Sequence, residues 1–499
     1  MAPCQTKEYR LKTAIFEPNG ANLQRGKTCR AADDEIDLHP IFTECLEGPD
    51  KCRHAQRFRL ASHNQVGETG PQRCDIEHSQ RHGDSAICAR ILLVVFSPTP
   101  HGYVYDFYAD AIDVIVNEGR LPAEGDCLVC YHPPLFPMIG ALIFRLVSMF
   151  GGSYDLQHYF VGAFTIVVSI VFCIYAYAIY RRYHDNYLNL WIWALVLFLP
   201  VIFIASFSVE SDLLASTLIV IAIYYFDVYR REGIPAALVA AGVFAGLAAM
   251  TKYSGLLICL VLGMFLLYDF VRDRNKVTFN KGLLFAVLCT VFGGYPYISN
   301  WVEYGTPFKG NEAWHTGKYY TELYTFTDFS IKDISDVIDK SSEPGILNTF
   351  PAYNSSVLTS HYGQLWTDFS FFANPTRHGH MYGNRIYRTK EIPMWIVKGV
   401  LWAGLVPLML SLIGFARMLV NKDSIFLMTL LGATLIVYIE WFYGFHIWML
   451  KTKYILHLLP VWLVMIGYGI QKLPDKAVMT AFTPSVVFSA LYCFSFAVL

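Results

Sequence analysis

Long apolar runs constrain this fold more than any other feature of the sequence. An α-helix needs about 20 mostly apolar residues to cross the hydrocarbon core of a membrane. Ten runs of roughly that length are found at 157–180, 187–206, 211–229, 236–251, 254–271, 282–299, 394–419, 424–443, 454–470 and 477–499. The composition agrees, because 54% of the 499 residues are hydrophobic and 16% are charged, whereas soluble domains have about 25% charged residues. The sequence therefore predicts an all-α, multi-pass integral membrane protein.

The charge of the connections predicts which way the helices run. Every second short connection is basic, and these connections are 181–185, 229–232, 272–276, 417–422 and 472–476. Short loops rich in lysine and arginine stay in the cytoplasm. The connection 208–212 and the long segment 300–393 then face the lumen or periplasm. Four acids fall on this outer side: Asp106, Asp110, Glu210 and Asp212.

The runs divide the chain into five parts. These are a polar amino-terminal segment (1–90), an outer loop with acids (91–156), a first helical block (157–299), an outer-face loop region (300–393) and a second helical block (394–499). The first part has no run long enough to span, and we expect it to be disordered or not native to the rest. The fourth part is too long for a plain connection, so we expect a small folded unit there.

The apolar run from Pro133 to Phe150 is not counted as a span, because a crossing there would invert every later loop. Prolines favour the start of a helix, and we expect an amphipathic helix that lies in the outer interface. With 101–156 outside, the chain must cross before residue 101, and no run there is long enough. We therefore expect either a missing first span or an unusual translocation of the amino terminus.

Charge and cysteines narrow the classes of function. The net charge is −1 and no basic tail or stripe is present, which argues against nucleic-acid binding. Cys127 and Cys130 form a C-x-x-C pair in the outer loop. A zinc site would need a second pair at suitable spacing, and none is seen. A local disulfide or two free thiols is the expectation, and no residue is assigned as a metal ligand.

Two pairs of acids could carry chemistry. Asp106 and Asp110 are four residues apart, so on a helix they share one face. Like charges so placed repel and raise each other's affinity for a proton, which suits a general base that works near neutral pH. The alternative is a helix cap and a solvated face. The second pair is Glu210 and Asp212, of which Asp212 could also be a helix cap.

Cations occur on the same outer side. Lys252 stands between two apolar runs, where an ammonium needs a partner or must reach the interface; it could bind an anionic lipid headgroup. Lys451, Lys453 and Tyr454 open a late apolar run at the outer face. These lysines are an exception to the cytoplasmic bias of basic residues, and lysine binds phosphate as a point charge. Ordinary interfacial anchoring is the alternative.

These motifs together resemble a known family. The luminal acids are followed by Arg120-Leu121-Pro122 and by the sequence from Tyr131 through His132, Pro133 and Pro134 to Leu135. This order resembles the first outer loop of GT-C fold glycosyltransferases. The closest branch is that of dolichyl-phosphate-mannose–protein mannosyltransferases and bacterial aminoarabinose transferases. The motifs at 208–212, 251–254, 300–308 and 453–454 fit the same pattern, and the likeness covers about residues 101–475.

The resemblance implies both an architecture and a reaction. The fold would be a GT-C-like bundle of about 10–11 transmembrane helices, with an outer-face interfacial helix and a luminal or periplasmic loop unit. The enzyme would transfer a sugar, with inversion, from a polyprenyl-phosphate (dolichyl-phosphate-like) donor to a hydroxyl of a protein, lipid or glycan. It would lie in the endoplasmic reticulum membrane of a eukaryote or the inner membrane of a bacterium.

The resemblance also implies residue roles. Asp106 would be the general base, and Asp110 and Asp212 would orient the acceptor or hold a divalent cation (Mg²⁺ or Mn²⁺), if the reaction uses one. Positive charge would stabilise the departing phosphate. The donor-phosphate contacts implied are Lys252, Lys451, Lys453 and Tyr454. The structural residues of the loop implied are Tyr131, His132, Pro133 and Pro134.

Two other classes compete with an enzyme. A secondary transporter would share the number of spans, but its acids and broken helices would lie near the bilayer midplane. Here the centres of the apolar runs are nearly free of charge. A catalytically inactive membrane scaffold of the same fold is the second alternative.

Overall fold

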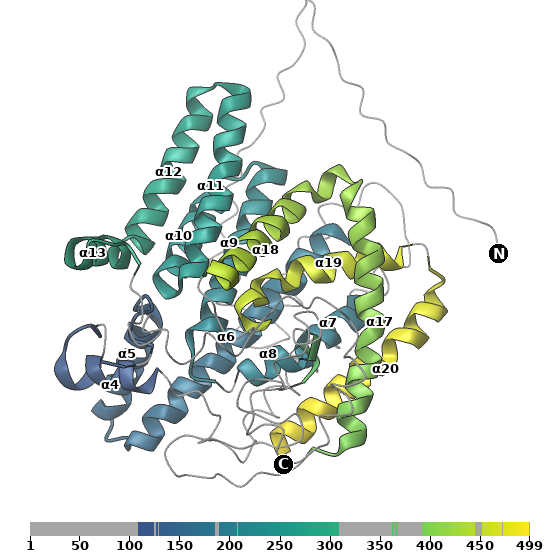
Figure 1. The fold of residues 1–499 in the computed structure, drawn as a ribbon, viewed down its shortest axis with the longest axis horizontal. Coiled ribbons are helices and arrows are strands. Elements are labelled where there is room, and N and C mark those ends of the chain that lie inside the picture. The colour runs from purple at the N-terminus through teal and green to yellow at the C-terminus, as the bar shows by residue number, and fades with distance from the viewer. Residues whose placement is uncertain are drawn as a thin grey trace, which may run out of the picture. The chain divides into compact units, whose positions relative to one another are not determined.

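The computed structural model describes the chain at 108–123, 126–127, 129–184, 189–206, 208–308, 362–363, 365–367, 392–444, 452–471 and 473–498. All of these residues fall in the unit Cys74–Leu499. Every regular element among them is a helix (Figure 1). The polar segment 1–90 and most of the loop region 300–393 lie outside the described residues, so the expectations for both stay predictions.

Each predicted apolar run is largely helical in the structure. In chain order they are α4 (Ala109–Glu118), α5 (Leu135–Met149), α6 (Tyr154–Tyr183), α7 (Asn189–Phe198), α8 (Pro200–Ala205), α9 (Ser211–Glu232), α10 (Pro235–Thr251), α11 (Tyr253–Asp273), α12 (Lys276–Gly293), α13 (Tyr295–Tyr304), α17 (Met394–Leu419), η3 (Lys422–Ser424), α18 (Ile425–Gly444), η4 (Thr452–Leu458), α19 (Leu459–Ile470) and α20 (Asp475–Val498). In the described part, seven helical stretches are long and apolar enough to cross a membrane: α6, α9, α11, α12, α17, η3 with α18, and α20. The prediction of an all-α, multi-pass membrane protein is confirmed.

Three predicted spans form shorter apolar helices. The run 187–206 is split into α7 and α8 at Leu199, whose backbone is extended and is followed by Pro200 at the first position of α8. Proline fits the start of a helix but not its interior. The run 454–470 begins as the 3₁₀ helix η4 before α19 continues it. The run 236–251 corresponds to α10, which has 17 residues.

The carboxyl end of one predicted span, 282–299, was wrong. The run 282–299 suggested a continuous helix, but α12 stops at Gly293 and α13 starts a new direction with Pro296 in its first turn. The break coincides with a close approach between α10 and α12. A Cβ on Gly293 would lie 2.4 Å from the carbonyl oxygen of Gly246, so only glycine allows this packing, as small residues do between membrane helices.

The basic connections gather at one end of the helices. Asp227, near the carboxyl end of α9, is buried and accepts from Arg182 Nε at 2.5 Å and from Arg231 Nε at 3.0 Å. Arg182 belongs to the last turn of α6. Two of the predicted basic connections, those after α6 and α9, therefore lie at the same end of these helices. Asp212 lies in the first turn of the same α9, so it is at the opposite end.

The helix that begins at Leu135, predicted to be amphipathic, has apolar residues on both its buried and its exposed face. Its inner face buries Phe136, Ala141 and Phe144, whereas Leu146 and Met149 are exposed, Met149 to 78%. The inner face packs on α4 and α6, and α4 ends at Gly119 with φ +69°, a conformation that favours glycine. An exposed apolar face is what the predicted interfacial helix requires, and its place in the outer interface stays a prediction.

Candidate functional site

The site is built where α9 starts and where α10 passes into α11. Lys252 is in an extended conformation (φ −159°, ψ 152°) between α10 and α11, so the chain turns at this lysine. Its Nζ forms an ion pair with Asp212 Oδ1 in the first turn of α9. Both side chains are largely buried, with 13% and 8% of their surface exposed. A buried ion pair keeps both charges in place, because losing one partner strands the other.

A third element reaches this ion pair from the carboxyl-terminal part of the chain. The Nζ of Lys252 lies 4.4 Å from the centroid of the Tyr454 ring, which η4 carries. A cation over an aromatic face is attracted by the ring's electron density. Tyr454, which the resemblance implied as a donor-phosphate contact, therefore packs against Lys252, although the two residues are far apart in the sequence.

The loop between α4 and α5 is attached to the site through Tyr131. Cys127 and Cys130 form a disulfide within it, which is one of the two outcomes expected for the C-x-x-C pair. Arg120 also holds the loop, because its guanidinium donates to both carboxylate oxygens of Asp126 at 2.6 and 3.1 Å. Farther along, the hydroxyl of Tyr253 donates to the carbonyl oxygen of Tyr131 at 2.8 Å. The loop is thus fixed to the residue that follows Lys252.

His132 lies among three tyrosines. The centroid of its ring is 4.0 Å from that of Tyr131 and 6.2 Å from those of Tyr108 and Tyr253. Burial, helped by the charge of Lys252, lowers the pKa of His132 to about 3, and Asp212 acts in the opposite direction. The imidazole is therefore neutral at physiological pH. The charges of both Lys252 and Asp212 act on its pKa.

Tyr108 and Ser211 connect the start of α4 to the start of α9. The hydroxyl of Tyr108 lies 2.5 Å from Ser211 Oγ, and both residues are buried. Burial and the charge of Asp212 raise the pKa of Tyr108. The sequence analysis missed both residues. Ser211 stands between Glu210 and Asp212, but nothing in its spacing shows that a tyrosine a hundred residues away contacts it.

The predicted acids are placed differently from one another. Glu210 is buried and is the N-cap residue of α9, although its side chain makes no capping hydrogen bond. The interpretation of Asp212 as the cap is therefore wrong, because Asp212 is inside the first turn and pairs with Lys252. Asp110 is in the first turn of α4 and is exposed.

Three predicted residues are beyond what the structure describes. Asp106 and Lys451 lie outside the described residues, and so does the side chain of Lys453, whose backbone belongs to η4. Their roles stay predictions. Pro133 and Pro134 are buried and lead directly into α5, as expected for residues that shape the loop.

The expected divalent cation stays a prediction, because the predicted acid Asp106 lies outside the described residues. Among the described residues, no three histidine, cysteine, aspartate or glutamate side chains come together as metal ligands. Asp212 is engaged with Lys252, and Asp110 is exposed on another helix.

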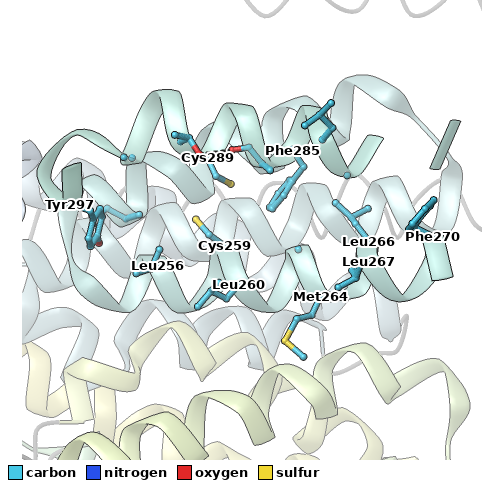
Figure 2. Close-up of a pocket in the computed structure, with 18 of the residues that line it drawn as sticks. Leu256, Cys259, Leu260, Met264, Leu266, Leu267, Phe270, Phe285, Cys289 and Tyr297 are labelled. Atoms are coloured by element: carbon cyan, nitrogen blue, oxygen red, sulfur yellow. Dashed lines mark hydrogen bonds between the residues drawn. The ribbon is translucent and has the colours of Figure 1, made fainter. Parts of the chain in front are cut away.

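An apolar groove runs along α11 and α12 (Figure 2). Its volume is about 790 Å³, and its lining includes Leu256, Leu260, Met264 and Phe285. Leu260 and Met264 are 58% and 66% exposed, so the groove is open along its side.

The groove ends beside the ion pair. Tyr297 and Phe308 line this end, and their rings lie 6.0 and 5.5 Å from that of Tyr253. Tyr253 is the residue that follows Lys252 in the chain. The apolar groove and the buried charges are therefore neighbours.

The chain matches a family model described as dolichyl-phosphate-mannose-protein mannosyltransferase over residues 131–294. The predicted resemblance to the mannosyltransferase branch is confirmed over this segment. The matched segment begins at Tyr131 and contains Asp212 and Lys252.

Comparisons with curated sequences and with solved structures give no match or only distant ones. No curated protein sequence matches the chain. ArnT from Cupriavidus metallidurans in the apo state is similar at 12% identity, over 81% of this chain and 76% of that one, with a TM-score of 0.36. ArnT from the same organism bound to undecaprenyl phosphate is similar at 13% identity, over 82% and 77%, with a TM-score of 0.38. These values are too low to assign roles to residues.

Proposed function

We propose that this protein transfers a sugar from a polyprenyl-phosphate donor to an acceptor hydroxyl at the end of the bundle where Lys252 lies. The observation that carries the proposal is the buried ion pair of Lys252 and Asp212, next in the chain to Tyr253, whose ring contacts Phe308 in the lining of an apolar groove. A polyprenyl phosphate has the matching parts, an anionic head on a long apolar tail.

Lys252 is the proposed contact for the donor phosphate. Its charge is held in place by Asp212 and by the ring of Tyr454 before any ligand arrives. A phosphate that leaves the sugar gains negative charge, and a cation already in position stabilises that charge without reorganisation. Lys451 and Lys453, which the family resemblance also implies as donor-phosphate contacts, would add positive charge near the phosphate.

The groove is the proposed site for the isoprenoid tail. Its lining is apolar, and its exposed residues Leu260 and Met264 leave it open to the lipid side of α11. A tail in the groove would keep its apolar surface out of water while the phosphate reaches Lys252. This arrangement explains why a sugar-transferring enzyme is embedded in a membrane.

Asp106 is the proposed general base, and the proposed outcome is inversion at the sugar carbon. The base takes the proton of the acceptor hydroxyl while the hydroxyl oxygen attacks from the face opposite the phosphate. Asp110 begins α4 close to Tyr108, which contacts Ser211 beside Asp212. An exposed carboxylate there is accessible to an acceptor, which Asp110 would orient.

The site is proposed to face the lumen or periplasm. The basic cluster of Arg182 and Arg231 is at the far end of α9 from Asp212, and basic ends favour the cytoplasm. The same polarity speaks against a transporter. In the described part of the chain, the buried acids Glu210, Asp212 and Asp227 all lie near helix ends, whereas transporter sites lie near the midplane.

The test is turnover by the purified protein in lipid nanodiscs. The substrates are labelled polyprenyl-phosphate sugars and a panel of peptide, lipid and glycan acceptors. The double variant Lys252→Met with Asp212→Asn keeps the site neutral, and it should lower turnover by about 100-fold or more. Lys281→Gln is the matched control, because Lys281 also lies over a tyrosine ring, that of Tyr229, at the basic end. No turnover by the wild type with any pair would favour the inactive scaffold.

A further inference from the structure

The sequence assigned His132 only a structural place in the loop, but its ring carries an unused polar atom. Its Nδ1 is buried and has no hydrogen-bond partner among the described residues. A buried polar atom without a partner costs about 1–3 kcal/mol, so an acceptor that approached Nδ1 from the neighbouring ion pair would be stabilised there. Pro133 and Pro134 follow directly and restrict the backbone, which holds the ring where it is.

The residues that contact His132 are next to the ion pair of Lys252 and Asp212. Its ring contacts Tyr253, which follows Lys252, and Tyr108, whose hydroxyl reaches Ser211 beside Asp212. The ring is therefore flanked by residues from both sides of the pair. Its pKa, lowered first by burial and then by Lys252, records the same proximity.

We propose that His132 contacts the donor directly: its Nδ1–H donates a hydrogen bond to a phosphate oxygen of the polyprenyl phosphate whose charge Lys252 binds. This inference rests on the proposed function and adds to it a second, uncharged contact. A neutral imidazole has one nitrogen that donates and one that accepts, and phosphate oxygens accept. Lys252 supplies the charge, whereas a ring fixed between tyrosines supplies direction.

A neutral imidazole suits this role better than that of a base. With its pKa near 3, His132 would hold a proton taken from an acceptor hydroxyl too weakly to serve as the general base. The same burial leaves the N–H donor present throughout the physiological pH range. His132 is thus a binding and positioning residue, and proton transfer is left to a carboxylate.

Three substitutions of His132 separate contact from packing. His132→Phe keeps an aromatic ring between the tyrosines and removes both nitrogens. The amide of His132→Asn stands close to the position of Nδ1, and that of His132→Gln stands close to the position of Nε2. His158→Phe is the control, since His158 packs on the rings of Phe144 and Tyr154 away from the ion pair.

The measurement is the Kd of the full-length protein in nanodiscs for polyprenyl monophosphate, with polyprenyl alcohol as the phosphate-free probe. His132→Phe and His132→Gln should weaken phosphate-lipid binding by about tenfold or more, and His132→Asn should stay within about threefold of wild type. Binding of the alcohol should not change in any variant. His158→Phe should bind both lipids as wild type does, and thermal unfolding should show that the variants remain folded.

The outcomes also separate this inference from the proposed function. If wild type binds polyprenyl monophosphate and Lys252→Met with Asp212→Asn does not, the proposed phosphate site stands. His132→Phe binding as tightly as wild type in that case would overturn only the role of His132. If wild type shows no preference for the phosphate lipid over the alcohol, both proposals fail. Should His132→Phe not fold, the comparison of the Asn and Gln variants decides, and equal affinities for those two would refute the contact.

Discussion

Lys252 and Asp212, forty residues apart in the chain, form a buried ion pair that joins the break between α10 and α11 to the first turn of α9. Three helix ends therefore meet at one pair of charges. Either charge without its partner would destabilise the fold, because a buried ion that loses its partner costs roughly 3–5 kcal/mol of stability. The pair thus supports the fold as well as the proposed chemistry.

This relationship predicts a non-additive pair of substitutions. Lys252→Met alone and Asp212→Asn alone should each lower thermal stability, since each leaves one unpaired charge. The double variant should be more stable than the sum of the two effects, by about 2 kcal/mol or more of coupling free energy. A double-mutant cycle from unfolding in detergent measures this coupling. Additive effects would show that the two side chains are not paired in the membrane.

The groove predicts a dependence on the length of the lipid tail. Leu260→Trp narrows the groove at an exposed lining position, so it should weaken binding of long-chain polyprenyl phosphates by about tenfold. Binding of a single-isoprene phosphate should be nearly unchanged. Leu412→Trp, at a 54% exposed position on α17, is the control. An equal loss for short and long tails would place the tail elsewhere.

The disulfide predicts sensitivity to reductants. Cys127 and Cys130 close a short loop next to Tyr131 and His132. Replacing both cysteines with serine should lower stability by about 2 kcal/mol or less, because short loops gain the least from a cross-link. Donor affinity should fall more clearly, since the loop is hydrogen-bonded to Tyr253, the residue after Lys252. Measurement of Kd with and without a dithiol reductant tests this, and the serine variant should no longer respond to the reductant.

The close approach of α10 and α12 predicts a steric effect at one glycine. Gly293→Ala adds a Cβ that would lie 2.4 Å from the carbonyl oxygen of Gly246. Because that atom is backbone, the helices must separate, and we expect a loss of about 1–3 kcal/mol. Gly432→Ala on α18 is the matched control, with nothing within 4 Å of the added Cβ. Equal unfolding temperatures for the two variants would contradict the packing.

His132 predicts a dependence of stability on pH. Its pKa in the folded protein is about 3, whereas an unfolded histidine titrates near 6.5. Between these values the unfolded state binds more protons, so the stabilising contribution of neutral His132 is present above about pH 6.5 and is lost as the pH falls toward 3. The difference in unfolding temperature between wild type and His132→Phe should therefore shift against wild type on acidification. A difference that does not change with pH would show an ordinary, solvated histidine.

The helices could be predicted from the sequence because each apolar run is a local signal. Runs such as 157–180 and 211–229 became α6 and α9 within a few residues. The breaks between helices could not be predicted in the same way. The end of α12 depends on Gly246 in another helix, and no window along 282–299 contains that information.

The sequence by itself determined that the chain is a bundle of membrane helices, since hydropathy acts residue by residue, and it predicted basic ends on one side and acids on the other. It also drew attention to Asp212, Lys252 and Tyr454 as separate points. Only the tertiary structure decided that these three side chains meet, that Tyr108 and Ser211 join them, and that His132 stands beside them with an open nitrogen. The reason is physical: pairing of buried charges depends on which helix ends pack together, and packing is a property of the whole bundle.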